Sequence, residues 1–166
     1  MLGKLKKLLG GAPAPAKLLD TGTPAPDFRA PTHDGRTIAL SDLRGRKVIL
    51  WFYPKADTPG CTVEGKGLCA QQAAFDALGA VILGVSFDAP PANKAFAEKF
   101  GFGYPLLCDT DRRIGMAYGA CDSPSAGHAR RITYVIDESG IIRHALPKVD
   151  PATHADELLG LLRSGQ

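Results

Sequence analysis

The sequence predicts an α/β fold in which a central mixed β-sheet is flanked by helices and preceded by an N-terminal β-hairpin. Two observations carry this prediction. From Thr23 onward, short apolar runs alternate with segments of helical spacing, and the last two strands are separated by a tight turn instead of a helix. Strands joined by helices pair in parallel, whereas a hairpin adds antiparallel pairing. The 166 residues have the length of one domain.

Each element has its own local signal. The pair Asp34-Gly35 between segments 28–31 and 37–40 is typical of a hairpin turn. The run 47–53 is continuously apolar, as in a strand that is buried on both faces. The other predicted elements are helix 61–78, strand 80–87, helix 88–100, strand 106–108, a helix that Asp109 or Asp111 caps and that runs to 118, strands 131–136 and 141–146, and a helix from Pro151 to 162 capped by Asp150. This order is that of a thioredoxin-like fold.

Residues 1–22 are predicted to form a leader, distinct from a domain at 23–166. The first nine residues place leucines on one helical face and lysines off it, and a segment rich in Pro and Ala follows at 12–16. Such a stretch could bind an anionic membrane surface, but nine residues are too few for a stable isolated helix. We therefore expect a flexible extension and no membrane attachment.

Charge and composition exclude several classes of function. The net charge of +3 comes from four lysines in the first 17 residues, which leave 16 basic and 17 acidic side chains. This balance, with no basic stripe among aromatics, argues against nucleic-acid binding. The longest apolar run, 48–53, is far below the roughly 20 residues that a membrane-spanning helix needs. Four scattered cysteines are typical of a reducing compartment, so a cytoplasmic location is expected.

Cys61 begins a predicted helix directly after a buried strand and a short loop. Unpaired backbone N–H groups and the positive end of the helix dipole both stabilise a thiolate at this position. Thr58 lies three residues earlier, within hydrogen-bonding reach of the sulfur, and Pro54 and Pro59 stiffen the loop. The pattern predicts a reactive thiol at the carboxyl end of the sheet.

The spacing Pro54-x-x-x-Thr58-x-x-Cys61 resembles the peroxidatic signature of the peroxiredoxins. Segments 52–55 and 57–62 resemble in particular their Q-type, or bacterioferritin-comigratory, subgroup of AhpC/TSA-like proteins. The resemblance continues through segments 25–28, 40–45, 85–86, 105–107 and 131–137, and so covers nearly all of the chain after Thr23.

The resemblance implies a thiol peroxidase that requires no metal, flavin or nicotinamide. The Cys61 thiolate would attack hydrogen peroxide or an organic hydroperoxide and become a sulfenic acid. Thr58, the backbone N–H of Cys61 and Arg131 would bind the peroxide oxygens, and Pro54 would shield the thiolate. Arg131 matches the family's motif, whereas Arg130 would face the other side of its strand. Thioredoxin or a similar dithiol would reduce the oxidised enzyme, and Q-type relatives suggest a monomer.

The sequence departs from the family pattern at the resolving cysteine. Many Q-type members place it five residues after the peroxidatic cysteine, where this chain has Lys66. Others place it about 35 residues on, but segment 93–99 contains no cysteine. One reading is therefore a one-cysteine mechanism that uses an external thiol.

Three other cysteines could still resolve the sulfenic acid. Cys121 lies in a loop, 119–129, that leads toward Arg131. Cys69 lies eight residues after the peroxidatic position, about 12 Å along an intact helix, so it would require local unwinding. Cys108 ends a short strand and is expected to lie too far to the side. Each of these thiols could equally be a structural core residue.

Two further side chains and one alternative function stay open. Glu64 could orient the active loop, or simply balance the dipole as an acid in the first helical turn. His128 is the only histidine near the predicted site, although a thiolate at a helix start needs no base. No histidine is spaced with a cysteine as in a metal site. The missing resolving positions also allow a redox sensor or scaffold with negligible turnover.

Overall fold

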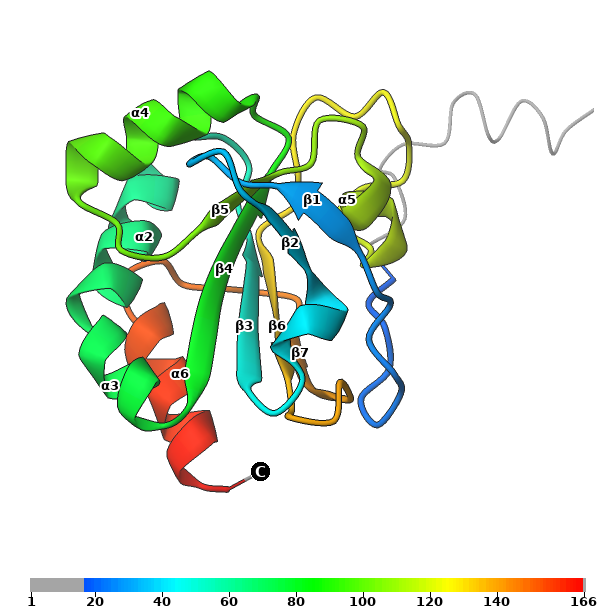
Figure 1. Ribbon diagram of the computed structural model, residues 1–166, viewed down its shortest axis with the longest axis vertical. Coiled ribbons are helices and arrows are strands. Elements are labelled where there is room, and N and C mark those ends of the chain that lie inside the picture. The colour runs from blue at the N-terminus through cyan, green and yellow to red at the C-terminus, as the bar shows by residue number, and fades with distance from the viewer. Residues whose placement is uncertain (1–16, 166) are drawn as a thin grey trace, which may run out of the picture.

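A five-stranded mixed sheet forms the centre of the protein in the computed structural model, which describes residues 17–165 (Figure 1). The strand order is β5-β4-β3-β6-β7. Strand β3 (Lys47–Phe52) pairs in parallel with β4 (Ala80–Ser86) and antiparallel with β6 (Ile132–Ile136). The edges are β5 (Leu106–Cys108), parallel to β4, and β7 (Ile142–Leu146), antiparallel to β6.

Helices cover one face of the sheet, and a hairpin with shorter helices covers the other (Figure 1). The first set is α2 (Pro59–Ala70), α3 (Gln72–Ala77), α4 (Pro90–Phe100) and α6 (His154–Arg163). The second set is β1 (Arg29–Pro31), β2 (Thr37–Ala39), the 3-10 helix η1 (Leu40–Leu43) and α5 (Arg113–Ala117). The separate two-stranded β1–β2 sheet and the mixed central sheet confirm the predicted fold class.

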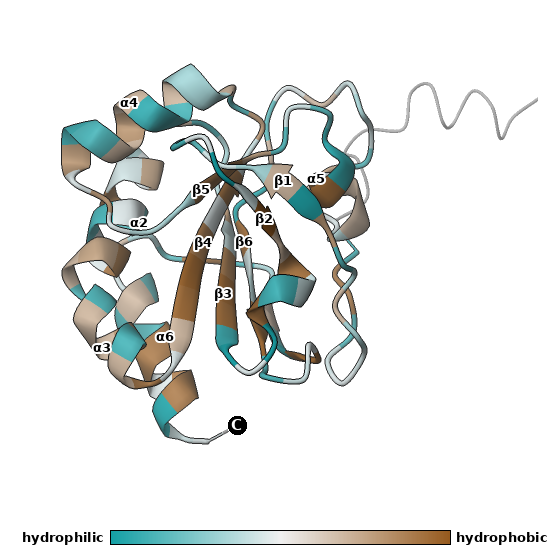
Figure 2. Ribbon diagram, in the orientation of Figure 1, coloured by the Kyte–Doolittle hydropathy of each residue, from teal (hydrophilic) through white to brown (hydrophobic). Residues whose placement is uncertain are grey.

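Strand β3 is the centre of the core because it is apolar on both faces. Val48, Leu50 and Phe52 pack into the cluster under the hairpin, whereas Ile49 and Trp51 pack into the cluster under α2 and α6. All five are at most 1% exposed. Figure 2 shows the same pattern, with the most hydrophobic residues along the central strands. A strand held on both sides gives the loop after it a rigid base.

The predicted helix 61–78 is two helices, and it begins earlier than expected. Helix α2 starts at Pro59, with Thr58 as the N-cap, because proline suits the first turn of a helix. It ends at Gln71, whose backbone φ of −104° and ψ of 10° are not helical, and α3 follows at once.

The last helix begins at His154, three residues later than predicted. Asp150 does act as a cap, since its Oδ1 accepts the N–H of Ala152 at 3.0 Å. That cap closes only a turn at 151–153, and the helix proper follows it. The delay places His154 at the start of α6.

The last residues of the predicted leader contact the domain that follows. Leu18 and Leu19 pack against the core cluster under the hairpin. The N–H of Leu19 donates to the Tyr134 hydroxyl at 3.1 Å, and that of Gly22 donates to the Ile142 carbonyl at 2.7 Å. Residues 1–16, which hold most of the predicted leader, lie outside the described residues. Within residues 17–165, every helix is too short or too polar to cross a membrane.

Candidate active site

Cys61 lies at the carboxyl end of the central strand, in the first turn of α2, and is fully buried. The loop before it is held by a hydrogen bond and an ion pair to residues near the two ends of α4. The N–H of Ala56 donates to Asp88 Oδ2 at 2.9 Å, and Asp57 pairs with Lys99 at 2.9 Å. Asp57 has a φ of 57°, a left-handed conformation that an aspartate tolerates better than most residues. These contacts hold the sulfur at the start of the helix.

Arg131 lies beside the sulfur, whereas Arg130 does not. The Nη2 of Arg131 donates to Cys61 Sγ at 3.5 Å. A Cβ added at Gly60 would lie 2.8 Å from that Nη2, so a glycine there leaves room for the guanidinium over the helix start. Arg130 instead forms an ion pair with Asp122. Alternation along the chain therefore separates the two arginines as expected.

Thr58 is close to Cys61 in sequence, but its hydroxyl is used differently from the prediction. It donates to the carbonyl of Lys55 at 2.7 Å, across the turn before α2. A hydroxyl has one proton, so in this conformation Thr58 can accept a hydrogen bond on the Cys61 side but cannot donate one to a thiolate.

Pro54 and Arg131 open onto a pocket of about 590 Å³ that also contains Cys121 and His128. The rest of its lining combines small residues with an aspartate and an arginine: Ala120, Asp122, Ser123, Ala126, Gly127, Ala129 and Arg130. The sequence-predicted candidates Pro54, Arg131, Cys121 and His128 thus share one hollow beside the buried sulfur.

The other three cysteines are poorly placed to form a disulfide with Cys61. All four thiols are free. Cys121 is 5% exposed and packs in the cluster under the hairpin, whereas Cys61 packs in the cluster on the α2 face. Burial raises the pKa of the Cys121 thiol. Cys69 donates to the Gly101 carbonyl at 3.4 Å, and Cys108 accepts from a buried asparagine amide.

Glu64 has a defined partner, and the dipole explanation for it is wrong. It is the sixth residue of α2, beyond the first turn, and it is 1% exposed. Its Oε1 accepts from Arg131 Nη1 at 2.7 Å. Burial raises the pKa of this carboxyl to about 7, against the lowering effect of the Arg131 guanidinium. Glu64 therefore holds the arginine that faces the sulfur.

His154 is the polar neighbour that sequence reasoning missed. Its Nε2 lies 2.9 Å from Thr133 Oγ1 and 3.6 Å from Glu64 Oε2, and the residue is 1% exposed. Burial, together with the charge of Arg131, lowers the pKa of His154 from 6.5 to about 4. No local signal marks this residue, because only the packing of α6 against α2 brings it to the site.

The lowered pKa of His154 predicts a pH dependence of folding. Between pH 6.5 and 4 the unfolded chain binds a proton at this position that the folded chain excludes, so the contribution of His154 to the free energy of unfolding falls as the pH falls. We expect His154→Gln to reduce this slope in urea denaturation. Between pH 8 and 9, where the imidazole is neutral in both states, the two proteins should show equal slopes. Identical slopes from pH 6.5 to 4 would contradict the prediction.

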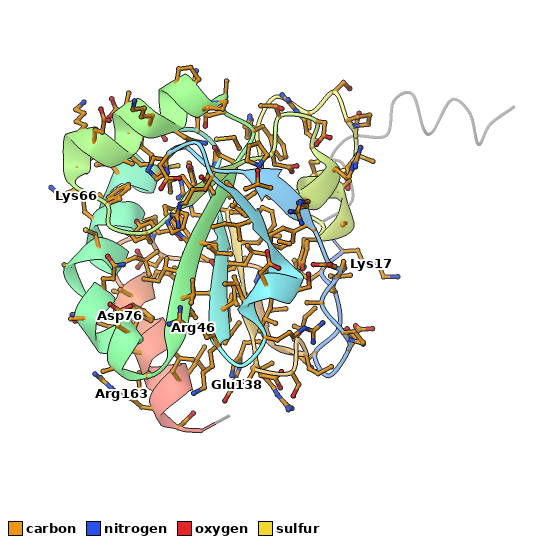
Figure 3. The ribbon with its side chains drawn as sticks, in the orientation of Figure 1. Lys17, Arg46, Lys66, Asp76, Glu138 and Arg163 are labelled. Carbon is orange, nitrogen blue, oxygen red and sulfur yellow. The ribbon has the colours of Figure 1, made fainter. Side chains whose placement is uncertain are left out.

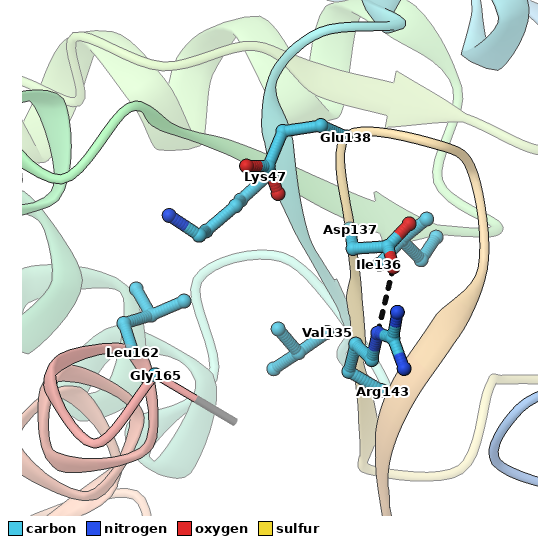
Figure 4. Close-up of a pocket in the computed structure, with 8 residues that line it drawn as sticks. All are labelled: Lys47, Val135, Ile136, Asp137, Glu138, Arg143, Leu162 and Gly165. Atoms are coloured by element: carbon cyan, nitrogen blue, oxygen red, sulfur yellow. Dashed lines mark hydrogen bonds and ion pairs between the residues drawn. The ribbon is translucent and has the colours of Figure 1, made fainter.

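A second pocket, of about 480 Å³, lies at the opposite end of the sheet (Figure 4). It is lined by Lys47, the first residue of β3, and by the ion pair of Asp137 with Arg143. None of its lining residues is a cysteine. In the part of the chain that the structure describes, no three His, Cys, Asp or Glu side chains are grouped as a metal site.

The chain is similar to proteins of one family over most of its length. Residues 21–145 match the AhpC/TSA family. The chain is 39% identical over 149 residues to a putative peroxiredoxin bcp of Coxiella burnetii, covering 87% of this chain and 99% of the relative. It is 35% identical over 150 residues to the peroxiredoxin Bcp of Escherichia coli K12, covering 87% and 96%.

Solved structures show the same likeness. Peroxidoxin BcpB of Mycobacterium tuberculosis has a TM-score of 0.82 at 31% identity, covering 89% of this chain and 99% of that one. The bacterioferritin comigratory protein of Xanthomonas campestris, studied for its alkyl peroxide reduction activity, has a TM-score of 0.81 at 32% identity, covering 88% and 99%.

Proposed function

The chain belongs to the AhpC/TSA family of peroxiredoxins, and from this premise we propose that Cys61 is the sulfur that attacks the peroxide. The protein is a thiol peroxidase, an enzyme that reduces a peroxide at the expense of a thiol. The observation that supports Cys61 is the Arg131 guanidinium, 3.5 Å from a sulfur at the start of a helix. Both features favour negative charge at that atom.

In the proposed reaction the Cys61 thiolate forms a bond to one peroxide oxygen as the O–O bond breaks. The sulfur loses two electrons and becomes a sulfenic acid, and the leaving oxygen takes a proton from solvent to become water or an alcohol. Arg131 stabilises the negative charge on the oxygens. Thr58, whose proton is engaged by Lys55, accepts a hydrogen bond from the peroxide O–H. Pro54, which lines the neighbouring pocket together with Arg131, has the role of shielding the thiolate in this proposal.

We further propose that an external thiol reduces the sulfenic acid. Lys66, at the expected resolving position, is exposed and points away from the sheet (Figure 3). Cys121 and Cys61 pack into clusters on opposite faces of the sheet, and the Cys69 thiol donates a hydrogen bond to the carbonyl of Gly101. Because Cys61 is fully buried, the first turn of α2 must open before that thiol reaches the sulfur. We also propose that thioredoxin or a similar dithiol is the external reductant, that the enzyme is a monomer, and that it is located in the cytoplasm.

The experiment is the intact mass of the protein after one equivalent of hydrogen peroxide, with and without a dimedone-type trap. We expect one trap adduct, mapped to Cys61, and no loss of two hydrogens. A disulfide between Cys61 and Cys121 or Cys69 would overturn the external-thiol proposal but keep the peroxidatic role of Cys61. An adduct on another cysteine, or no oxidation at all, would overturn that role.

Cys121→Ser is the matched control for this measurement. If an external thiol reduces the enzyme, the variant gives the same Cys61 adduct as the wild type and the same change in mass on oxidation without the trap. If Cys121 resolves, the wild type loses two hydrogens and only the variant retains a trappable sulfenic acid.

A further inference from the structure

A chain of buried polar side chains runs inward from the sulfur of Cys61. Arg131 donates from Nη2 to Cys61 Sγ at 3.5 Å and from Nη1 to Glu64 Oε1 at 2.7 Å. Behind them, His154 Nε2 lies 3.6 Å from Glu64 Oε2 and 2.9 Å from Thr133 Oγ1. Glu64, Thr133 and His154 are each at most 1% exposed. They come from α2, β6 and α6, so three elements meet at this point.

The second oxygen of the Glu64 carboxyl lacks a donor. Glu64 Oε2 and His154 Nδ1 are both buried without a hydrogen-bond partner among the described residues. A buried carboxyl oxygen without a hydrogen-bond donor carries an energetic cost. In the Nε2–H tautomer, the single proton on His154 Nε2 is shared between Thr133 Oγ1 at 2.9 Å and Glu64 Oε2 at 3.6 Å, so Glu64 receives the longer contact.

We propose that His154 is a positioning residue for peroxide reduction, which holds Glu64 from behind so that Glu64 aims Arg131 at the Cys61 sulfur. The inference rests on the proposed roles of Cys61 and Arg131. A carboxyl fixed at one oxygen only can rotate, and the guanidinium bound to it rotates too. Fixed at both oxygens, it holds the two arginine nitrogens in one plane, with Nη2 on the sulfur. His154 itself touches neither sulfur nor peroxide.

Two amide replacements of His154 test this role. The Gln side chain places its amide nitrogen near the position of imidazole Nε2, whereas Asn is one methylene shorter and does not reach Glu64. The measurement is the single-turnover rate constant of Cys61 oxidation by hydrogen peroxide, followed by the fluorescence of Trp51, the single tryptophan. We expect His154→Gln to stay within about 3-fold of the wild type, and His154→Asn to slow oxidation by about 10-fold or more.

Urea denaturation of the same samples separates positioning from stability. If His154 only fills the core, both variants lose stability but keep the wild-type rate constant, and the proposal fails. His33→Gln is the matched control, because His33 makes a hydrogen bond elsewhere, with its Nδ1 accepting from the N–H of Leu106. Its rate constant should equal that of the wild type.

A double-mutant cycle with Glu64→Gln shows whether His154 acts through Glu64. In the Glu64→Gln background, His154→Asn should cause no further loss of rate, since the residue through which it acts is already altered. Additive losses would overturn the proposed route. Cys61→Ser, measured in parallel, separates failure of the His154 proposal from failure of the proposed function. If Cys61→Ser is still oxidised at the wild-type rate, the assignment of Cys61 as the attacking sulfur is wrong, and not only the role of His154.

Discussion

Replacing Cys61 with serine is expected to abolish peroxide consumption. A serine hydroxyl at the start of α2 stays protonated at neutral pH, so the helix dipole and Arg131 have no anion to stabilise and no nucleophile is present. Peroxide consumption with excess dithiothreitol measures the effect. Because the side chain is buried in the core cluster and the exchange replaces one atom, the variant should remain folded.

Cys69→Ser is the matched control, since it makes the same exchange of atoms on the same helix. Cys69 is partly exposed, and its thiol donates to the Gly101 carbonyl, which a serine hydroxyl also does. In a single turnover with stoichiometric peroxide this variant should consume peroxide at the wild-type rate. Peroxide consumption by Cys61→Ser would mean that another group is the nucleophile.

Replacing Arg131 with lysine is expected to slow Cys61 oxidation by about 100-fold, the usual cost of removing one oriented donor from a site where charge develops. In the structure two nitrogens of the guanidinium are used at once, one on Glu64 and one on the sulfur. A lysine ammonium has one nitrogen and cannot reproduce this fork. It stays on Glu64 or approaches the sulfur, but does not hold both. Stopped-flow oxidation with hydrogen peroxide measures the rate constant.

Arg130→Lys provides the comparison at the adjacent position. Arg130 pairs with Asp122, whose side chain is largely exposed, and an exposed ion pair contributes little to stability. Its rate constant should be that of the wild type. No loss in either variant would mean that only the positive charge of the arginines matters, and a loss in Arg130→Lys alone would mean that the assignment of Arg131 is wrong.

Much of the site could be predicted because it depends on neighbours in sequence. Pro54, Thr58 and Cys61 lie within one strand, loop and helix start, so their spacing alone places them close together. The direction of the Thr58 hydroxyl could not be predicted in this way. It depends on the turn that brings the Lys55 carbonyl within 2.7 Å.

The role of Glu64 shows where local reasoning fails. An acid near a helix start is explained by the dipole if the helix begins at Cys61, but Pro59 starts it two residues earlier. Glu64 therefore belongs to the second turn. There it lies on the buried face of the helix and accepts a hydrogen bond from Arg131. Element boundaries are the least certain part of a sequence-based prediction, and here two residues change the function assigned to a side chain.

The sequence alone determined the order of strands and helices, the strand that is buried on both faces, and the thiol at the start of a helix. These follow from periodicity, turn residues and short spacings, which act over a few residues. Only the tertiary structure decided which groups surround that thiol. Arg131 and His154 are 70 and 93 positions beyond Cys61, and they reach Cys61 and Glu64 because Arg131 directly precedes β6, the neighbour of β3, and because α6 packs beside α2. Burial of those polar groups together, and not any local pattern, fixes their partners and their charges.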